Sequence, residues 1–264
     1  MIRYSGPGLC VAARVDPLPD ICVLLLSLLF ACPKRPPAAA PAVDAIFEAS
    51  IEAAGGREAM LEHQNVISRG QVRAPGAQMR LTVYHAAPDS LYTTLEVPQL
   101  GVISAGYSDG VAWEFNPLMG PRLLVGDEAV QEARRADFYA TLNYTTHYPQ
   151  RTLIGRAVFA GTETWEVSAQ TVLGDHETLY FDVDSGLLRG SQVLRRTDSG
   201  ALPSTTTFSE HRRIGGILLP VVMIQESVGV EVIITLDEIH YDVESMPSLA
   251  PPPMVLELVS EQGL

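Results

Sequence analysis

The stretch that most constrains the fold runs from Arg151 to Leu188, because it contains three consecutive runs in which apolar and polar residues alternate. In the clearest run, residues 164–172, Trp165, Val167 and Ala169 fall on one side and polar residues on the other. A period of two is typical of β-strands. Glycine-containing turns separate the runs, and no helix of about 10–15 residues fits between them, so we expect an antiparallel meander.

The chain on either side repeats this pattern, which predicts about eleven antiparallel strands within residues 42–250. Helical spacing of apolar residues predicts helices over 43–54, 57–63 and 127–139. The last of these is expected to turn four residues inward, namely Val130, Ala133, Arg134 and Phe138. One sheet of this length curls. We therefore expect a mainly β (α+β) fold, a strongly curved antiparallel sheet that forms an incomplete β-barrel, with helices covering the open side. Residues 251–264 are expected to be a C-terminal tail along the surface.

The N-terminal segment is expected to be a targeting signal. Residues 21–31 form an apolar run of 11 residues, shorter than the roughly 20 that a membrane-spanning helix needs and typical of a signal peptide. The run ends Leu29-Phe30-Ala31-Cys32, which resembles a bacterial lipobox. That resemblance implies a signal peptide over 1–32, a lipid attached to Cys32, and a Pro/Ala tether over 33–41. A plain cleaved signal with its site near 38–40, and an uncleaved anchor, remain alternatives.

Composition argues against several classes of function. The net charge of −13 disfavours binding to nucleic-acid phosphates, which needs a basic surface. All three cysteines lie in the first 32 residues, so the folded part has no cysteine for a disulfide, a nucleophile or a metal. The six histidines lack zinc-binding spacing, and Asp175, Asp182 and Asp184 lack the spacing of a calcium loop. We expect no metal and no cofactor.

The sequence also predicts no catalytic site. SxxK and phosphate-binding-loop motifs are absent from it. Ser209 and His211 share one face of a strand, but Glu210 between them points away. Three arginine pairs, at 134–135, 195–196 and 212–213, either meet anionic lipid headgroups or are solvated ends of helices and strands.

A series of short motifs carries a resemblance to a known family. In chain order these are Gly55-Gly56, residues 65–70 (NVISRG), residues 107–113 (YSDGVAW), residues 180–188 (YFDVDSGLL) and residues 211–220 (HRRIGGILLP). Their order and spacing resemble the outer-membrane lipoprotein-sorting family, the LolA/LolB-like proteins. The resemblance implies an incomplete β-barrel closed by helices, with an apolar concave cavity that holds acyl chains.

The resemblance gives two hypotheses for function. In the first, the chain is a non-enzymatic lipid- or lipoprotein-binding module, anchored through Cys32 to the periplasmic side of the outer membrane. Its partners would be a lipid or acylated protein, and the inner leaflet of the outer membrane. In the second, it is an accessory or structural lipoprotein that binds a protein partner and fills the cavity with its own side chains. The candidate ligand-binding residues on the apolar concave face are Leu81, Val83, Tyr92, Leu95, Trp113, Phe115, Trp165 and Val167.

Overall fold

A computed structural model describes residues 40–197 and 200–262, in which the chain forms five helices and 13 strands. The helices are α1 (Val43–Ala53), α2 (Arg57–Glu62), α3 (Asp127–Ala136), α4 (Tyr144–His147) and α5 (Pro253–Gln262). The first six strands are β1 (Asn65–Ala74), β2 (Ala77–Ala86), β3 (Ser90–Val97), β4 (Gly101–Ser108), β5 (Val111–Asn116) and β6 (Gly120–Leu124). The others are β7 (Gln150–Phe159), β8 (Thr162–Gln170), β9 (His176–Asp182), β10 (Leu188–Thr197), β11 (Gly200–Ile214), β12 (Ile217–Ser227) and β13 (Val230–Tyr241).

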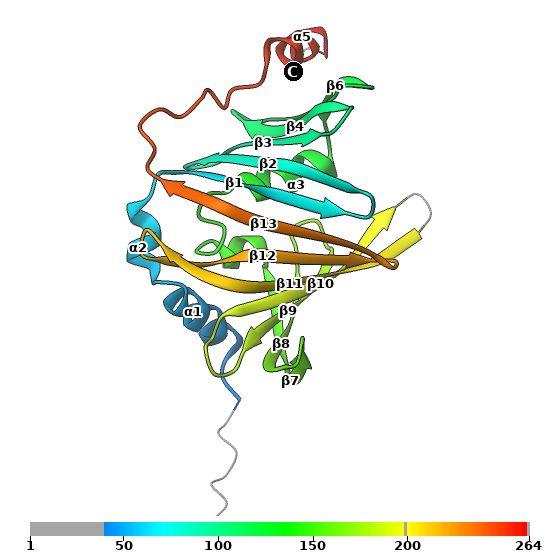
Figure 1. Cartoon of the computed structure of the whole chain (residues 1–264). Coiled ribbons are helices and arrows are strands. Elements are labelled where there is room, and N and C mark those ends of the chain that lie inside the picture. Colours follow the sequence, from blue (N-terminus) through cyan, green and yellow to red (C-terminus); the bar gives the residue numbers. More distant parts are fainter. Residues whose placement is uncertain (1–39, 198–199, 263–264) are drawn as a thin grey trace, which may run out of the picture. The chain divides into compact units, whose positions relative to one another are not determined.

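All these strands belong to one antiparallel sheet, in the order β6-β5-β4-β3-β2-β1-β13-β12-β11-β10-β9-β8-β7 (Figure 1). The only neighbours far apart in the chain are β1 and β13, which pair from Val66↔Tyr241 to Arg73↔Ile233. The edge strands β6 and β7 do not pair with each other in the described part of the chain, so the sheet is open. The predicted fold class, an incomplete antiparallel barrel with helices, is confirmed.

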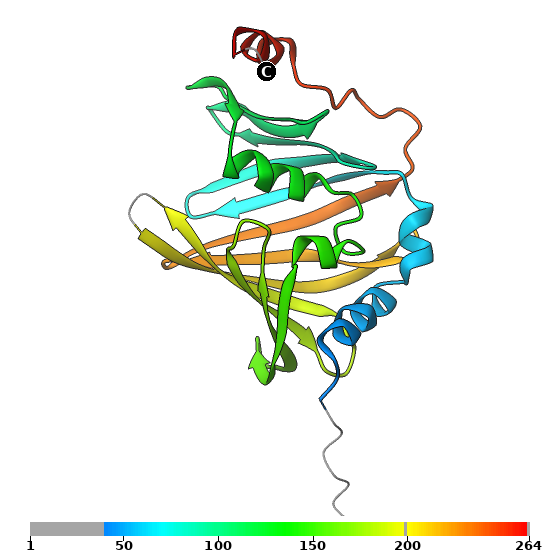
Figure 2. The same cartoon turned by 180° about the vertical axis from the view of Figure 1, so that it is seen from behind.

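Cross-strand register assigns every strand residue to one of two faces of the sheet, because directly paired residues lie on the same side. We call the side that carries α1, α3 and α4 the inner face and the opposite side, which carries α5, the outer face. Figure 2 looks onto the inner face, with α3 and α4 in front of the strands. His85 of β2 marks this face near α3, since its Nε2 lies 2.9 Å from the carbonyl oxygen of Ala136.

The largest buried cluster lies where α1 and α4 cross the inner face of β8 and β9. Phe47 of α1 stacks on Tyr144 of α4, with ring centroids 4.5 Å apart, and meets Phe181 of β9 edge-on at 5.0 Å. Ile46 and Ile51 lie on the same side of α1 and are buried in this cluster. This helical stripe, at the spacing that the sequence predicts, is what holds α1 against the sheet.

Four elements differ from the sequence-based expectation, and one of them is the short helix α4, which is not among the helices predicted above. Residues 116–126, whose two prolines predict a loop, contain β6, because Pro121 is tolerated in an edge strand, where its missing N–H costs no ladder bond. Helix α3 ends at Ala136, and its buried residue is Ala136, whereas Val130 is 40% exposed; the predicted inward position of Val130 is wrong. The expected C-terminal tail forms helix α5, whose Val255 is fully buried on the outer face.

Candidate functional site

The central strands carry two adjacent apolar rows on the inner face. Each row is a chain of directly paired residues on neighbouring strands. The first row is Phe208–Met223–Ile234–Val72–Met79. The second row is Leu236–Gly70–Leu81–Leu95–Ile103. With strands about 4.8 Å apart, five residues extend over about 19 Å. We call these two rows the apolar band.

The apolar band is only partly covered by the rest of the described chain. Phe208, Met223, Ile234 and Met79 are half-buried, although they lie in the middle of the sheet rather than at its edges. The core cluster to which Met223, Ile234 and Leu81 belong consists of strand residues alone. By contrast, the clusters at β8–β9 and at β5–β6 each include a helix. The band is therefore a contiguous apolar surface on a helix-bearing face.

One residue of the band is required to be glycine. A Cβ atom at Gly70 would lie 1.9 Å from the carbonyl oxygen of Thr235. The pairing of β1 with β13 shifts at this position, between Arg69 and Gly70. Such a bulge bends the sheet and sharpens its twist. Gly70 thus allows the close approach of two strands at the centre of the apolar band.

An ion pair on the inner face joins α3 to β9. Arg134 donates to both carboxylate oxygens of Glu177, at 2.8 and 3.4 Å, and its guanidinium lies 4.8 Å from the ring centre of Tyr148. The Tyr148 hydroxyl donates to Glu177 at 2.6 Å. Burial, together with the negative charge of Glu177, raises the pKa of Tyr148, so the hydroxyl stays protonated and keeps donating. This cluster fixes α3 across the inner face.

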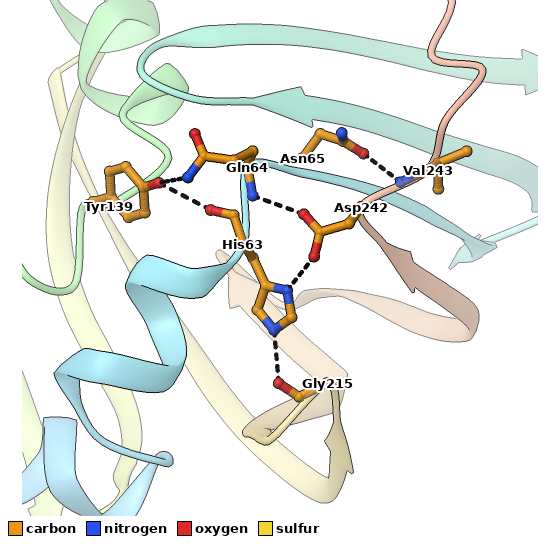
Figure 3. Close-up of polar contacts among 7 residues, drawn as sticks. All are labelled: His63, Gln64, Asn65, Tyr139, Gly215, Asp242 and Val243. Atoms are coloured by element: carbon orange, nitrogen blue, oxygen red, sulfur yellow. Dashed lines mark hydrogen bonds and ion pairs between the residues drawn. The ribbon is translucent and has the colours of Figure 1, made fainter.

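A second polar network, centred on His63, ties the end of α2 to two distant parts of the sheet (Figure 3). His63 Nδ1 lies 2.6 Å from Asp242 Oδ2, and Nε2 lies 2.6 Å from the carbonyl oxygen of Gly215. Both partners are acceptors, so the doubly protonated ring satisfies both. Burial lowers the pKa of His63, but the hydrogen bonds to Asp242 and Gly215 raise it, and the raising effects together outweigh burial. The pKa of His63 is therefore raised above its ordinary value of 6.5.

Neighbouring residues extend this network. The Gln64 backbone N–H donates to Asp242 at 2.8 Å, and the Val243 N–H donates to the Asn65 side chain at 2.8 Å. The Tyr139 hydroxyl donates to the His63 carbonyl oxygen at 2.9 Å (Figure 3). Both ring nitrogens of His63 are occupied by structural bonds. The network therefore holds the end of α2 to the sheet and is not arranged as an acid–base site. No motif in the sequence singles out His63.

The structure divides the eight predicted ligand-binding residues into three groups. Leu81, Val83 and Leu95 lie on the inner face, in or beside the apolar band. Trp165 and Val167 also face inward but belong to the cluster beneath α1. Tyr92, Trp113 and Phe115 lie on the outer face. The expectation that all eight share one face is wrong for this last group, and a ligand-binding role for the others stays a prediction.

The outer-face group forms a separate core under α5. Leu123 of β6 pairs directly with Trp113, and Tyr92 of β3 reaches the Trp113 ring across Gly106, with ring centroids 5.6 Å apart. Val255 of α5 packs against the same cluster. A Cβ at Gly106 would lie 2.9 Å from the Trp113 ring, so only glycine leaves room for it. Trp113 Nε1 is buried without a hydrogen-bond partner in the described residues. The part of the outer face under α5 is therefore a packed core rather than an open surface.

Sequence reasoning missed Phe208, Met223 and Ile234 as candidate site residues. The alternation within 204–213, 217–228 and 230–243 placed each residue on a face of its own strand. It did not reveal that these three faces coincide with that of Leu81, because register across strands is not visible in one sequence.

The other groups of polar residues considered as metal or catalytic sites have structural explanations in the described residues. The Asp182 carboxylate accepts from the backbone N–H groups of Asp184 and Ser185, which is a turn and not a metal site. In residues 40–197 and 200–262 there is no group of three or more potential ligands that could hold a metal ion. Ser209 and His211 share the outer face, and Glu210 lies in a left-handed conformation between them.

The arginine pairs are largely engaged. Arg135 donates to Glu132, Arg212 donates to the Leu236 carbonyl, and Arg213 donates to the Gly216 carbonyl. Side chains 195 and 196 lie outside what the structure describes, as do Cys32 and the apolar segment before it. Among the described helices none combines the length and hydrophobicity needed to cross a membrane.

Comparison with known proteins supports the fold. No protein-family model matches the chain, and no curated protein is similar to it in sequence. The crystal structure of a LolA superfamily protein from Nitrosomonas europaea is similar over 79% of this chain and 96% of that chain, with a TM-score of 0.54 and 15% identity. A DUF1329 family protein from Desulfovibrio piger is similar over 78% and 95%, with a TM-score of 0.53 and 14% identity. The LolA/LolB-like fold predicted from the sequence is confirmed.

Proposed function

We propose that this chain is a lipid-binding module of the bacterial cell envelope that holds acyl chains on the apolar band. The observation that carries the proposal is the exposure of the band. Phe208, Met223 and Ile234 are half-buried at the centre of a 13-stranded sheet, where side chains are normally covered. Apolar residues in such a position are stabilised when an apolar ligand removes them from water.

The energetics of acyl binding fit a passive carrier or receptor. Each methylene that leaves water contributes about 0.8 kcal/mol, so burying about ten of them yields about 8 kcal/mol before the cost of ordering the chain. Transfer then needs only a receiving site of better affinity. The proposed activity is accordingly non-enzymatic and uses no nucleotide or metal.

The proposal includes a lipid anchor at Cys32 and a location on the periplasmic side of the outer membrane. It is supported by the lipobox-like sequence Leu29-Phe30-Ala31-Cys32. The next residue is Pro33, whereas a signal for retention in the inner membrane usually has Asp at that position. In cells fed an alkyne-labelled fatty acid, the full chain should become labelled and fractionate with outer membranes. A Cys32→Ser variant that is labelled equally would refute the anchor.

Native mass spectrometry tests acyl binding directly. Residues 40–264 form one compact unit that contains every core cluster described above. This fragment, produced in a bacterial periplasm and purified without detergent, should carry a reproducible extra mass equal to a fatty acid or phospholipid. Met223→Asp, which puts a charge in the band, should lose that mass, whereas Ile224→Asp on the outer face of the same strand should keep it. A bare protein mass after incubation with lipid vesicles would overturn the proposal.

The alternative is an accessory protein whose cavity is filled by its own side chains. That reading requires the centre of the inner face to be fully buried. The half-buried state of Met79, Met223 and Ile234 favours the lipid-binding reading.

A further inference from the structure

A neutral polar surface borders the apolar band on the inner face. The row next to Phe208 and Met223, one pleat further along the strands, contains three polar residues, Ser191, Thr206 and Gln225, between Leu179 and Val232. The row after that pairs Ser204 with Ser227. We call these five polar residues the polar belt. Polar residues of a strand usually face water on the outer side, so five of them on the helix-bearing side are an exception.

The belt has unused hydrogen-bonding capacity. In the described part of the chain, no hydrogen bond is formed by the side chains of Ser191, Thr206 or Gln225, and only Ser227 of the belt bonds, to the carbonyl of Pro203. Ser204 is buried to 5% exposure. A hydroxyl donates one bond and accepts up to two, and an amide does both, so the belt offers several donors and acceptors at once.

A small hollow opens at the belt. Ser204, Gln225 and Ser227 line it together with Val230 and Val232, and its volume is about 170 Å³. This is smaller than the roughly 300 Å³ at which pockets for whole ligands begin. It suits the polar end of a ligand whose apolar part lies elsewhere, and the apolar band begins directly beside it at Met223 and Ile234.

The belt carries no formal charge. The row of Ser204 and Ser227 continues through Val193 to Glu177, which lies two strands away from Ser204. The Glu177 carboxylate already accepts hydrogen bonds from Arg134 and Tyr148. An anionic headgroup needs a cation or several donors that are aimed at it. Neutral hydroxyl and ester groups need only the donors and acceptors that the belt supplies.

We infer that the polar belt is the headgroup subsite of the proposed lipid site, and that its ligand is an uncharged glyceryl ester of a fatty acid. The inference rests on the proposed function, since it presumes that the acyl chain lies on the apolar band. The ester and glycerol hydroxyls then bond to Thr206 and Gln225, and the chain runs from Met223 toward Met79. Such ester chemistry occurs both in free acylglycerols and in glycerophospholipids, and the test separates the two.

The experiment is a calorimetric titration of residues 40–264, freed of bound lipid, with three probes that share one palmitoyl chain. The probes are monopalmitoylglycerol, palmitate and palmitoyl-lysophosphatidylglycerol, each below its micellar concentration. We expect monopalmitoylglycerol to bind about tenfold more tightly than either anionic probe, as two additional hydrogen bonds would give.

Two variants of the belt provide the decisive comparison. Thr206→Val and Gln225→Leu keep the shape of the side chains but remove the hydrogen-bonding groups, and together they should abolish the tenfold preference while palmitate binds as before. The matched control is Thr207→Val, which makes the same change on the outer face of the same strand. Equal urea midpoints for Thr206→Val and Thr207→Val exclude a general loss of folding.

The outcomes separate the two proposals. Binding of palmitate with no preference for the glyceryl ester, or a preference that survives in the double variant, overturns the belt and leaves the lipid-binding function standing. Tighter binding of the lysophospholipid overturns the uncharged ligand in favour of a phospholipid. Binding of none of the three probes overturns the proposed function itself.

Discussion

Replacing Phe47 by alanine should remove much of the stability of the fold, because this ring joins α1 and α4 to β9. Phe47 is 6% exposed and lies against three aromatic rings, Tyr144 stacked at 4.5 Å, Phe181 edge-on at 5.0 Å and Tyr148 tilted at 6.3 Å. A buried Phe→Ala change costs about 3–5 kcal/mol. We therefore expect a loss of about 4 kcal/mol, which is a large part of the total of about 5–15 kcal/mol typical of a domain.

Urea unfolding of residues 40–264 measures this loss through the midpoint, provided that the slope is unchanged. The matched control is Leu118→Ala, in a turn where the side chain is 80% exposed and the expected change is below about 0.5 kcal/mol. A double-mutant cycle with Tyr144→Ala should give a coupling of about 1 kcal/mol for the stacked pair. A Phe47→Ala loss as small as that of Leu118→Ala would refute the packing of α1 on the inner face.

Three further predictions concern other parts of the structure. The upward pKa shift of His63 means that its contribution to stability is complete below about pH 6.5 and is lost as the pH rises through the raised value. Urea midpoints of the natural protein and His63→Gln should therefore converge as the pH is raised above 6.5, and a constant difference would contradict this. Gly70→Ala should cost about 3 kcal/mol or prevent folding, since its Cβ would overlap a carbonyl oxygen, and a urea midpoint within error of the natural protein's would refute that close approach. In Trp165→Phe protein, where Trp113 is the only tryptophan, adding Leu258→Asp to release α5 should shift the fluorescence to longer wavelength; unchanged emission would show that α5 does not cover Trp113.

Local chemistry made most of the sheet predictable. Alternation in residues 151–188 and the turn residues that follow each run mark strand ends without any knowledge of tertiary structure, and β7, β8 and β9 lie there. The prediction failed where tertiary position overrides local preference. Pro121 argues for a loop unless the strand is known to be an edge. Helix α5 has few local signals beyond its apolar residues, and its position depends on Trp113, far away in the sequence.

The candidate site was harder to predict than the fold, for a reason that lies in the geometry of sheets. Alternation sorts the residues of one strand into two faces, but it does not tell which face of the next strand lies on the same side. A shift of one residue exchanges the faces, and the register shifts at three places here, between Arg69 and Gly70, between Leu153 and Gly155, and between Leu188 and Gly190. Bulky aromatic residues therefore suggested a ligand site at Trp113, which register places on the opposite side.

The same reasoning explains why the polar belt is invisible in the sequence. From the sequence alone, Thr206 and Gln225 are expected to face solvent. Thr206 lies between Thr205 and Thr207, so no alternation marks its face, and Gln225 is a polar residue that follows the apolar Ile224. Only the pairing of Thr206 with Gln225, beside that of Phe208 with Met223, shows that hydroxyl and amide groups adjoin apolar ones on the inner face. A surface that is apolar in one row and neutral but polar in the next changes its character along the strands, within a single face of the sheet. That is the arrangement required by a ligand with a fatty chain and an uncharged polar end.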